Sequence, residues 1–463
     1  MNLFKQEDTI VALATPQGKA ALAVLRISGK NSLKAVSSVF FDKKHKSVNI
    51  ENRKIHHGYI YDSDKKIDEV VVSYMQQPNS STGEDVIEIT SHGNPVIVQS
   101  IIELLLKNGI RLADRGEFSY RAFINNKMDL TEAESINTLI SSSTKKAVQL
   151  SLNTLQGAFS TEIKNIKEQM TQLYAYLEVS LDYPEEEIDF LTREQKIQSL
   201  KNIITQVQNL TSCYVLNKNI IDGVQIAIVG KPNAGKSSIL NSILGYGRAI
   251  VTDIAGTTTD TIKETIEYKG FLFSVTDTAG LRNHWANSIE QIGQERTKNS
   301  IETSDIILFV LDGSKPFDKD DQAVLNLLKN RVDDTIIVVN KSDLVEKIST
   351  DNLQKIYDKN KFIKYSCIDK KDINVLLEKI YNICGLQDKT DNSSMLINAR
   401  QYNLLCELKN KLEETLSVVI KADQDEIVSF QAQESLKIIN EILGVDIKDD
   451  ILISIFSKFC IGK

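Results

Sequence analysis

The chain has 463 residues, of which 41% are hydrophobic and 25% charged, and its formal net charge is −7. This length is too great for one hydrophobic core and predicts about three domains, while the composition is typical of a soluble globular protein. No apolar stretch approaches the roughly 20 residues of a membrane helix, and the polar start MNLFKQEDTI has the character of neither a secretory signal nor a transit peptide. A cytoplasmic protein without a membrane partner is therefore expected.

Cysteine content and net charge exclude further classes of protein. The five cysteines are an odd number without C-x-x-C spacing, which argues against a disulfide framework and a zinc site and fits a reducing compartment. The acidic balance makes the overall field repulsive to nucleic acid. If the protein binds nucleic acid, it must therefore use a local basic patch or a partner protein.

The N-terminal part mixes short β-rich runs with one helical segment, which predicts an α+β domain over residues 1–125. The helix is expected at Pro95–Lys107. The strands are expected at Ile10–Ala14, Leu22–Ile27, Val70–Tyr74 and Val86–Ser91.

Beyond Thr131 the hydrophobic residues recur at helical spacing. Apolar side chains between Ile163 and Leu177, and again between Leu436 and Leu443, are three or four residues apart, which is typical of amphipathic helices that pack together. We expect two helical parts that pack as one domain, with a small α/β domain inserted between them. The helical parts are residues 126–222 and 386–463, and the inserted domain is residues 223–385.

The inserted domain opens with a phosphate-binding loop. Gly230-Lys-Pro-Asn-Ala-Gly235-Lys236-Ser237 matches G-x-x-x-x-G-K-[ST], with a strand-like run at Val224–Val229 before it and a helix start at Ser238–Leu244 after it. The glycines let backbone N–H groups surround a phosphate, and the helix N-terminus adds partial positive charge. Lys236 is expected to reach the outer phosphates, and Ser237 to ligate Mg²⁺.

Three later elements indicate which base is bound, and each follows a strand-like run. The Asp at the start of Asp277-Thr-Ala-Gly280 can hold Mg²⁺ through water, and its Gly can donate to the γ-phosphate. In Asn340-Lys-Ser-Asp343, the carboxylate can accept from guanine N1–H and the 2-amino group, two donors that adenine lacks. Ser366-Cys-Ile368 would place a backbone N–H near guanine O6. Four such elements in order predict a GTP-binding domain rather than an ATP-binding one.

The hydrolytic machinery differs from that of many Ras-like GTPases. Thr252–Thr258 lies where a switch loop is expected, with Thr258 as second Mg²⁺ ligand. Leu281 follows the DTAG element, where many Ras-like enzymes carry the Gln that orients the attacking water. We therefore expect Asn233 and the carbonyl-rich switch loop to enclose a monovalent cation, which supplies the positive charge of an arginine finger.

Further motifs lie outside the nucleotide loops. They are Ala14-Thr-Pro16, Leu25-Arg-Ile-Ser-Gly29, Asn79–Asp85, Gly116–Ser119, Arg121–Phe123, Lys127–Leu130 and the terminal Phe459–Lys463. Together with GKPNAGKSS and TDIAGTT in the inserted domain, they make the chain resemble the MnmE (TrmE) family of tRNA-modification GTPases over nearly its whole length.

The resemblance implies a multidomain α+β and α/β protein. An N-terminal α+β folate-binding-like domain would mediate homodimer formation, beside a helical domain with an inserted Ras-like P-loop GTPase domain. The cofactor implied is 5-formyl-tetrahydrofolate or a related reduced folate, with Arg26, Glu84, Lys127 and Lys463 at the matching positions. Arg and Lys suit the glutamate carboxylates of folate, and Glu84 suits the amino donors of the pterin.

The resemblance also assigns roles in the GTPase domain. The K⁺ ligands it implies are Asn233, Thr252, the Ile254 carbonyl and Thr257. The Mg²⁺ ligands it implies are Ser237 and Thr258. It gives a catalytic role to Glu290, which would arrange the hydrolytic water, beside the catalytic role expected of Lys236. Cys460 in the terminal motif is a further catalytic candidate, for which the resemblance settles no role and a packing role stays open. The GTP contacts implied are Asn233, Ala234, Gly235, Lys236, Ser237, Ser238, Thr252, Asp253, Ile254, Ala255, Gly256, Thr257, Thr258, Asp277, Thr278, Ala279, Gly280, Asn340, Lys341, Ser342, Asp343, Ser366, Cys367 and Ile368.

The chain departs from the family pattern in two places. Thr259 stands where the family's TDIAGTTRD carries Arg, so a contact made by that Arg is lost. Segment Asn283–Ser288, which holds the only tryptophan, is one residue longer than the pattern. The second departure bears on the switch geometry before Glu290.

The function implied is GTP hydrolysis coupled to modification of tRNA. With an FAD-dependent MnmG (GidA)-type partner, in a heterotetramer, the protein would add a carboxymethylaminomethyl-type group at C5 of the wobble uridine (position 34) of certain tRNAs, using a folate one-carbon unit. The alternative is a GTP-binding switch in ribosome assembly with no chemistry on tRNA. Saturable folate binding separates the two, because the switch has no use for a folate site.

Overall fold

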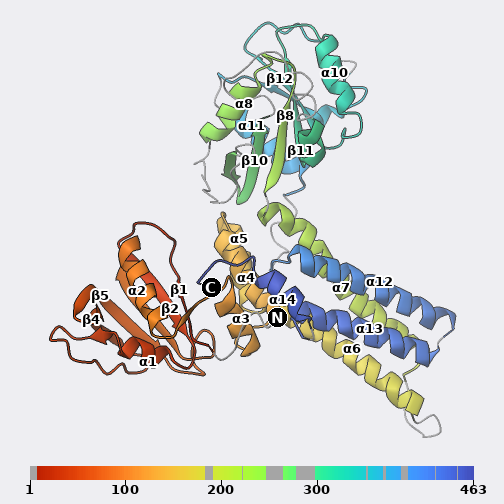
Figure 1. The fold of residues 1–463 in the computed structure, drawn as a ribbon. Coiled ribbons are helices and arrows are strands. Elements are labelled where there is room, and N and C mark those ends of the chain that lie inside the picture. The colour runs from red at the N-terminus through yellow and green to blue at the C-terminus, as the bar shows by residue number, and fades with distance from the viewer. Residues whose placement is uncertain are drawn as a thin grey trace. The chain divides into compact units, whose positions relative to one another are not determined.

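A computed structural model describes residues 8–182, 191–221, 223–246, 264–277, 298–350, 353–368, 372–386, 395–422, 424–445 and 447–462 (Figure 1). The chain forms two compact units. One comprises residues 1–140, 154–208 and 400–463, and the other comprises residues 141–153 and 209–399. Among the described residues, no helix is both long and apolar enough to cross a membrane.

The first unit contains a seven-stranded sheet in the order β3-β4-β5-β6-β2-β1-β7, with only the β1–β7 pair parallel. Leu25 and Ile27 point into a core shared with two helices, α1 (Ser32–Ser37) and α2 (Pro95–Lys107). The strands are β1 (Ile10–Leu13), β2 (Leu22–Ser28), β3 (Phe40–Phe41), β4 (Ile55–Asp62), β5 (Lys65–Met75), β6 (Val86–His92) and β7 (Arg111–Leu112). The predicted strands and helix are confirmed, although β5 begins five residues before the predicted Val70.

The rest of this unit is helical, and α6 packs along α13 (Figure 1). The apolar residues predicted to form a stripe between Ile163 and Leu177 are all buried, which confirms that the spacing marks a packing face. At the end of α13, Ile439, Ile442 and Leu443 are buried as well. The helices are α3 (Glu117–Ile124), α4 (Leu130–Ser141), α6 (Ala158–Asp182), α7 (Arg193–Ile221), α12 (Ala399–Lys421), α13 (Asp425–Leu443) and α14 (Asp449–Phe456), and α4 and α7 extend into the second unit.

The second unit contains a six-stranded sheet in the order β13-β12-β11-β8-β10-β9. All neighbours are parallel except β9 and β10. Parallel strands place their carboxyl ends along one edge of a sheet, where ligands bind in open α/β folds. The strands are β8 (Val224–Val229), β9 (Glu264–Tyr268), β10 (Phe271–Asp277), β11 (Ile306–Asp312), β12 (Thr335–Asn340) and β13 (Phe362–Tyr365).

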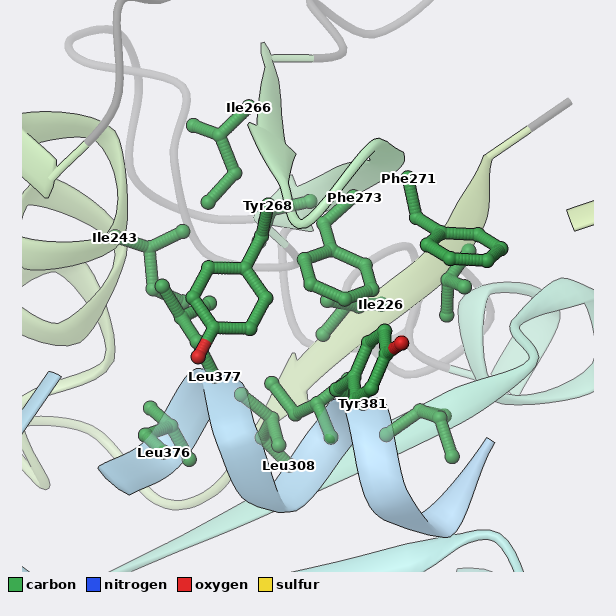
Figure 2. Close-up of a cluster of buried hydrophobic side chains, with 14 of the residues drawn as sticks. Ile226, Ile243, Ile266, Tyr268, Phe271, Phe273, Leu308, Leu376, Leu377 and Tyr381 are labelled. Carbon is green, nitrogen blue, oxygen red and sulfur yellow. The ribbon is translucent and has the colours of Figure 1, made fainter. Parts of the chain in front are cut away.

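Both faces of this sheet are covered, as near-continuous apolar strands require. On one face, Ile226, Phe273 and Leu308 of the sheet pack with side chains from α8 and α11, including Leu377 and Tyr381 (Figure 2). A second cluster of buried side chains, which includes Ile307 and Phe309, covers the other face. The helices are α5 (Lys145–Leu155), α8 (Lys236–Tyr246), α10 (Lys319–Leu327) and α11 (Asp372–Ile383).

Candidate functional sites

The phosphate-binding loop connects β8 to α8, as predicted, and packs tightly against neighbouring strand ends. Gly230 and Gly235 have φ angles of +152° and +100°. A Cβ on Gly230 would lie 2.4 Å from the Val310 carbonyl oxygen, and one on Gly235 would lie 2.0 Å from Asn340 Nδ2. Only glycine fits at these two positions, because any side chain would collide with backbone or with a buried amide.

Lys236 begins α8, and its ammonium group is held by the loop itself. Nζ donates to the carbonyl oxygens of Gly230 and Lys231 at 2.9 Å each. Ser237 and Ser238 follow in the first helical turn and are exposed. The loop thus presents an ammonium group and hydroxyls at a helix N-terminus. The ammonium group suits the phosphates of a triphosphate, and a hydroxyl suits its Mg²⁺.

The Asn340–Asp343 element at the end of β12 is tied to the phosphate loop. Asn340 Nδ2 donates to the Ala234 carbonyl oxygen at 2.9 Å. Lys341 Nζ lies 3.3 Å from the Asn233 carbonyl oxygen and 2.7 Å from Asp312 Oδ2. The structure therefore brings together two elements that the sequence places about 100 residues apart, as expected when both follow parallel strands of one sheet, here β8 and β12 on either side of β11.

The third element, Ser366–Ile368, follows β13 and orients the carboxylate predicted to read the base. Ser366 Oγ donates to Asp343 Oδ1 at 2.7 Å, and the Ser366 backbone N–H donates to Asp372 Oδ2 at 2.7 Å. Cys367 Sγ lies 3.7 Å from Asn340 Oδ1, so this element contacts both ends of the preceding one. Asp343 itself is exposed, which leaves its carboxylate accessible to donors from a base.

Asp312, at the end of β11, contacts the Asn340–Asp343 element, and sequence reasoning did not single it out. It is buried, and it accepts from Lys341 Nζ and from the Ser314 hydroxyl at 2.6 Å. Burial alone would raise the pKa of Asp312, but the bonds from Lys341 and Ser314 outweigh burial and lower it. The available signal was an Asp directly after the apolar run Ile306–Leu311, the same pattern that precedes Asp277 and Asn340.

Several predicted nucleotide residues lie outside the described residues, and of Asp277 only the backbone is described, at the end of β10. For K⁺, Asn233 has a left-handed φ of +63° and an exposed side chain. For Mg²⁺, the described candidate is Ser237. The predicted residues outside the described part are Thr252, Asp253, Ile254, Ala255, Gly256, Thr257, Thr258, Thr278, Ala279, Gly280, Glu290 and Lys463, together with the departures at Thr259 and Asn283–Ser288.

A second group of predicted residues lies on the sheet of the first unit. Arg26 on β2 faces Glu88 on β6, and its Nε and Nη2 donate to Glu88 Oε1 at 3.0 and 2.8 Å. Its guanidinium carbon lies 5.9 Å from the centre of the Phe118 ring. Nη1 has no hydrogen-bond partner among the described residues, and 26% of the side chain is exposed, so Arg26 can still donate to a carboxylate.

Glu84 lies in the loop before β6 and is fixed by two donors. Ser28 Oγ donates to Glu84 Oε2 at 2.7 Å, and Arg121 Nη1 lies 3.1 Å from the same oxygen. Arg121 is 3% exposed and also donates to Glu117 at 2.9 Å, whose side chain is fully buried. Arg111 makes a second ion pair with Glu117 at 2.6 Å. The sequence predicted Glu84 but gave no sign of this charge network behind it.

Lys127 lies beside the same loop. Gly83 has a φ of +79°, and a Cβ placed on it would lie 2.9 Å from Asn125 Cβ and 3.3 Å from Lys127 Cε. Asn125 Nδ2 also donates to the Thr82 carbonyl oxygen at 2.8 Å. Because Ser28 lies two residues from Arg26 on one face of β2, the contacts connect Arg26, Glu84 and Lys127 around one surface of the sheet. This mixed cationic and anionic set fits a ligand with carboxylates and amino groups.

The C-terminal motif lies against the end of β1. A Cβ on Gly462, whose φ is +89°, would lie 2.3 Å from the Leu13 carbonyl oxygen. Phe459 is buried against Phe456, with ring centres 5.2 Å apart. Cys460, between Phe459 and Gly462, is exposed. The motif is therefore anchored by Phe459 and Gly462, and the thiol is left at the surface.

Comparisons with known proteins cover nearly the whole chain. The family model described as "MnmE helical domain" matches residues 130–460, and "GTP-binding protein TrmE N-terminus" matches residues 9–127. A protein of Endomicrobium trichonymphae named tRNA modification GTPase MnmE is 44% identical over 466 residues, which span 100% of each chain. Proteins with the same name from Thermotoga petrophila and Clostridioides difficile are 38% and 37% identical, over 98% and 99% of this chain and 100% and 99% of theirs. The chain therefore belongs to the MnmE family of tRNA modification GTPases.

Proposed function

We propose that this GTPase acts in the cytoplasm with an FAD-dependent MnmG-type partner. Together they would add a carboxymethylaminomethyl-type group at C5 of the wobble uridine, position 34, of certain tRNAs. A reduced folate such as 5-formyl-tetrahydrofolate would supply the one-carbon unit, and Mg²⁺ and K⁺ would serve the nucleotide site. The chain would function as a homodimer within a heterotetramer with its partner.

The observation that carries the proposal is the convergence of three elements at one edge of the second sheet. Asn340 and Lys341 contact the carbonyl oxygens of the phosphate loop, while Ser366 orients Asp343. A carboxylate held in this way recognises the paired donors of guanine, which adenine does not offer. The full-length similarity to tRNA modification GTPases supports the step from guanine nucleotide to tRNA.

The chain's own residues have separable tasks in this proposal. Lys236 would balance charge on the outer phosphates, and its bonds to the loop carbonyls keep its ammonium group in place beforehand. Ser237 would hold Mg²⁺, whose role is to neutralise the phosphate charge that grows during hydrolysis. Asp343 would bind the base and take no part in bond breaking. Arg26, Glu84 and Lys127 would orient the folate in the other unit.

Deleting the gene tests the proposal directly. Bulk tRNA from the deletion strain is expected to lose the C5 group on wobble uridines, and plasmid-borne wild-type protein is expected to restore it. The measurement is nucleoside analysis of digested tRNA by mass spectrometry. Wobble uridines that carry the full modification in the deletion strain would refute the proposed function.

The alkali cation gives a second prediction. Replacing Na⁺ by K⁺ is expected to raise the GTPase rate by roughly 10²-fold, the usual effect of one preorganised positive contact on developing phosphate charge. Asn233→Gly is expected to abolish the difference. Glycine is the suitable replacement because the φ of +63° at this position strains most other residues.

Steady-state GTP hydrolysis in matched KCl and NaCl buffers provides the measurement. Asn326→Ala, an exposed asparagine on α10, serves as the control and should keep the wild-type response. Equal wild-type rates in the two salts would remove the cation from the proposal, and an unchanged salt response in Asn233→Gly would remove Asn233 from the cation site.

A further inference from the structure

Lys231, the second residue of the phosphate loop, makes ion pairs with the half-exposed Asp318 and the buried Asp321 at the start of α10. Its Nζ lies 2.6 Å from Asp318 Oδ2 and 2.7 Å from Asp321 Oδ2. The Lys231 side chain is 8% exposed and that of Asp321 is 2% exposed. The positive charge of Lys231 is therefore directed at two carboxylates rather than at the concave side of the loop.

The two carboxylates are held rigidly, because they form the N-terminal cap of α10. Asp318 Oδ1 accepts from the backbone N–H groups of Asp320 and Asp321 at 3.0 and 3.1 Å. Asp321 Oδ2 in turn accepts from the Asp318 backbone N–H at 3.2 Å, which completes a reciprocal capping box. Lys231 thus pairs with groups whose positions the helix backbone fixes.

The backbone of Lys231 contacts the residue that meets the phosphates. Its carbonyl oxygen accepts from Lys236 Nζ at 2.9 Å and from the Ala234 N–H at 3.3 Å. One residue therefore connects α10, through its side chain, with the ammonium group of Lys236, through its carbonyl.

Lys231 remains charged in this environment. Burial lowers its pKa, but the hydrogen bonds to Asp318 and Asp321 outweigh burial and raise it overall. Asp321 Oδ1 is buried and accepts no hydrogen bond among the described residues, so its charge depends on Lys231 for compensation. The charge of Lys231 and the geometry of its two contacts therefore both favour the ion pair.

We propose that Lys231 is a positioning residue for nucleotide binding: its ion pair with the capping box of α10 fixes the phosphate loop, and Lys231 itself does not touch the nucleotide. This inference rests on the guanine nucleotide chemistry proposed above. The fixed loop binds the phosphates that GDP and GTP share. Loss of the ion pair therefore lowers the affinity for both nucleotides to a similar extent and leaves the rate of the hydrolytic step nearly unchanged.

The test compares Lys231→Met with Lys231→Arg in the full-length protein. Lys231→Met is expected to raise Kd for GDP and GTP about tenfold each, or ~1.4 kcal/mol, with kcat within about twofold of wild type. Lys231→Arg, which keeps the charge, is expected to bind within about threefold of wild type. Fluorescence titration with labelled nucleotides measures Kd, and Lys269→Met, which removes a more exposed ion pair with Glu378 in the same unit, is the control.

A triple variant separates positioning from simple charge repulsion. Lys231→Met combined with Asp318→Asn and Asp321→Asn removes the uncompensated carboxylates but does not restore the link to α10. The triple variant is expected to bind both nucleotides several-fold more weakly than wild type. Full recovery in the triple variant, or wild-type affinity in Lys231→Met, would overturn this inference alone. Failure of the wild-type protein to bind GTP would overturn the proposed function, and this inference with it.

Discussion

Asp343→Asn is expected to weaken GTP binding by roughly 10²- to 10⁴-fold and to favour xanthosine triphosphate instead. Two hydrogen bonds to a carboxylate contribute about 1.5–3 kcal/mol each, so their loss accounts for about 3–6 kcal/mol. An asparagine presents one oxygen and one amide N–H₂ group, and the latter opposes the 2-amino group of guanine. Xanthine carries a carbonyl oxygen at that position and accepts from the amide.

Competition of GTP, xanthosine triphosphate and ATP against a labelled guanine nucleotide measures this change. The Ser366 hydroxyl, 2.7 Å from Asp343 Oδ1, can donate to an asparagine oxygen as well, so the side chain is expected to keep its orientation. Asp333→Asn changes a fully exposed carboxylate in the same unit and should leave all three affinities unchanged. Retention of tight GTP binding by Asp343→Asn would contradict the assignment of Asp343 to base recognition.

The convergence of the phosphate loop, Asn340–Asp343 and Ser366–Ile368 could be predicted from the sequence because the information for it is local. Each element comes directly after an apolar strand, and parallel strands bring their carboxyl ends to one edge without any knowledge of distant contacts. Asp312 was missed because a single Asp after a strand carries no motif, and its cationic partner Lys341, 29 residues away, becomes a neighbour only in the folded sheet. The partners of Lys231 were hidden for the same reason, since Asp318 and Asp321 lie 87 and 90 residues away.

The N-terminal site shows what motif matching leaves out. Arg26 and Glu84 were predicted individually, but the charges that hold them depend on strand register and on helix packing. Glu88 faces Arg26 only because β2 and β6 pair in one particular register, although α1 and three strands separate them in the sequence. Arg121 reaches Glu84 from α3, which no local pattern in the loop indicates. Stability and site geometry in this unit therefore depend on residues that carried no chemical signature in the sequence.

Arg121→Met is the second prediction with a large effect, and it concerns stability. Arg121 is 3% exposed and pairs with Glu84 and with the fully buried Glu117. Methionine fills most of the space but leaves Glu84 without its cationic partner and Glu117 with Arg111 alone. Removing one partner from a buried ion pair destabilises a protein by up to about 3–5 kcal/mol, and because Arg111 still pairs with Glu117, we expect the lower end of this range.

Hydrogen exchange of the seven-stranded sheet, measured together with thermal unfolding of the full-length variants, reports the effect within the first unit. This readout is needed because a chain with two compact units does not unfold in one step. Lys54→Met, which breaks the exposed pair with Glu51 in the same unit, should cost at most about 1 kcal/mol. If Arg121→Met left sheet protection at the level of Lys54→Met, the network around Glu117 would contribute no more than a surface ion pair, and Glu84 would owe its position to Ser28.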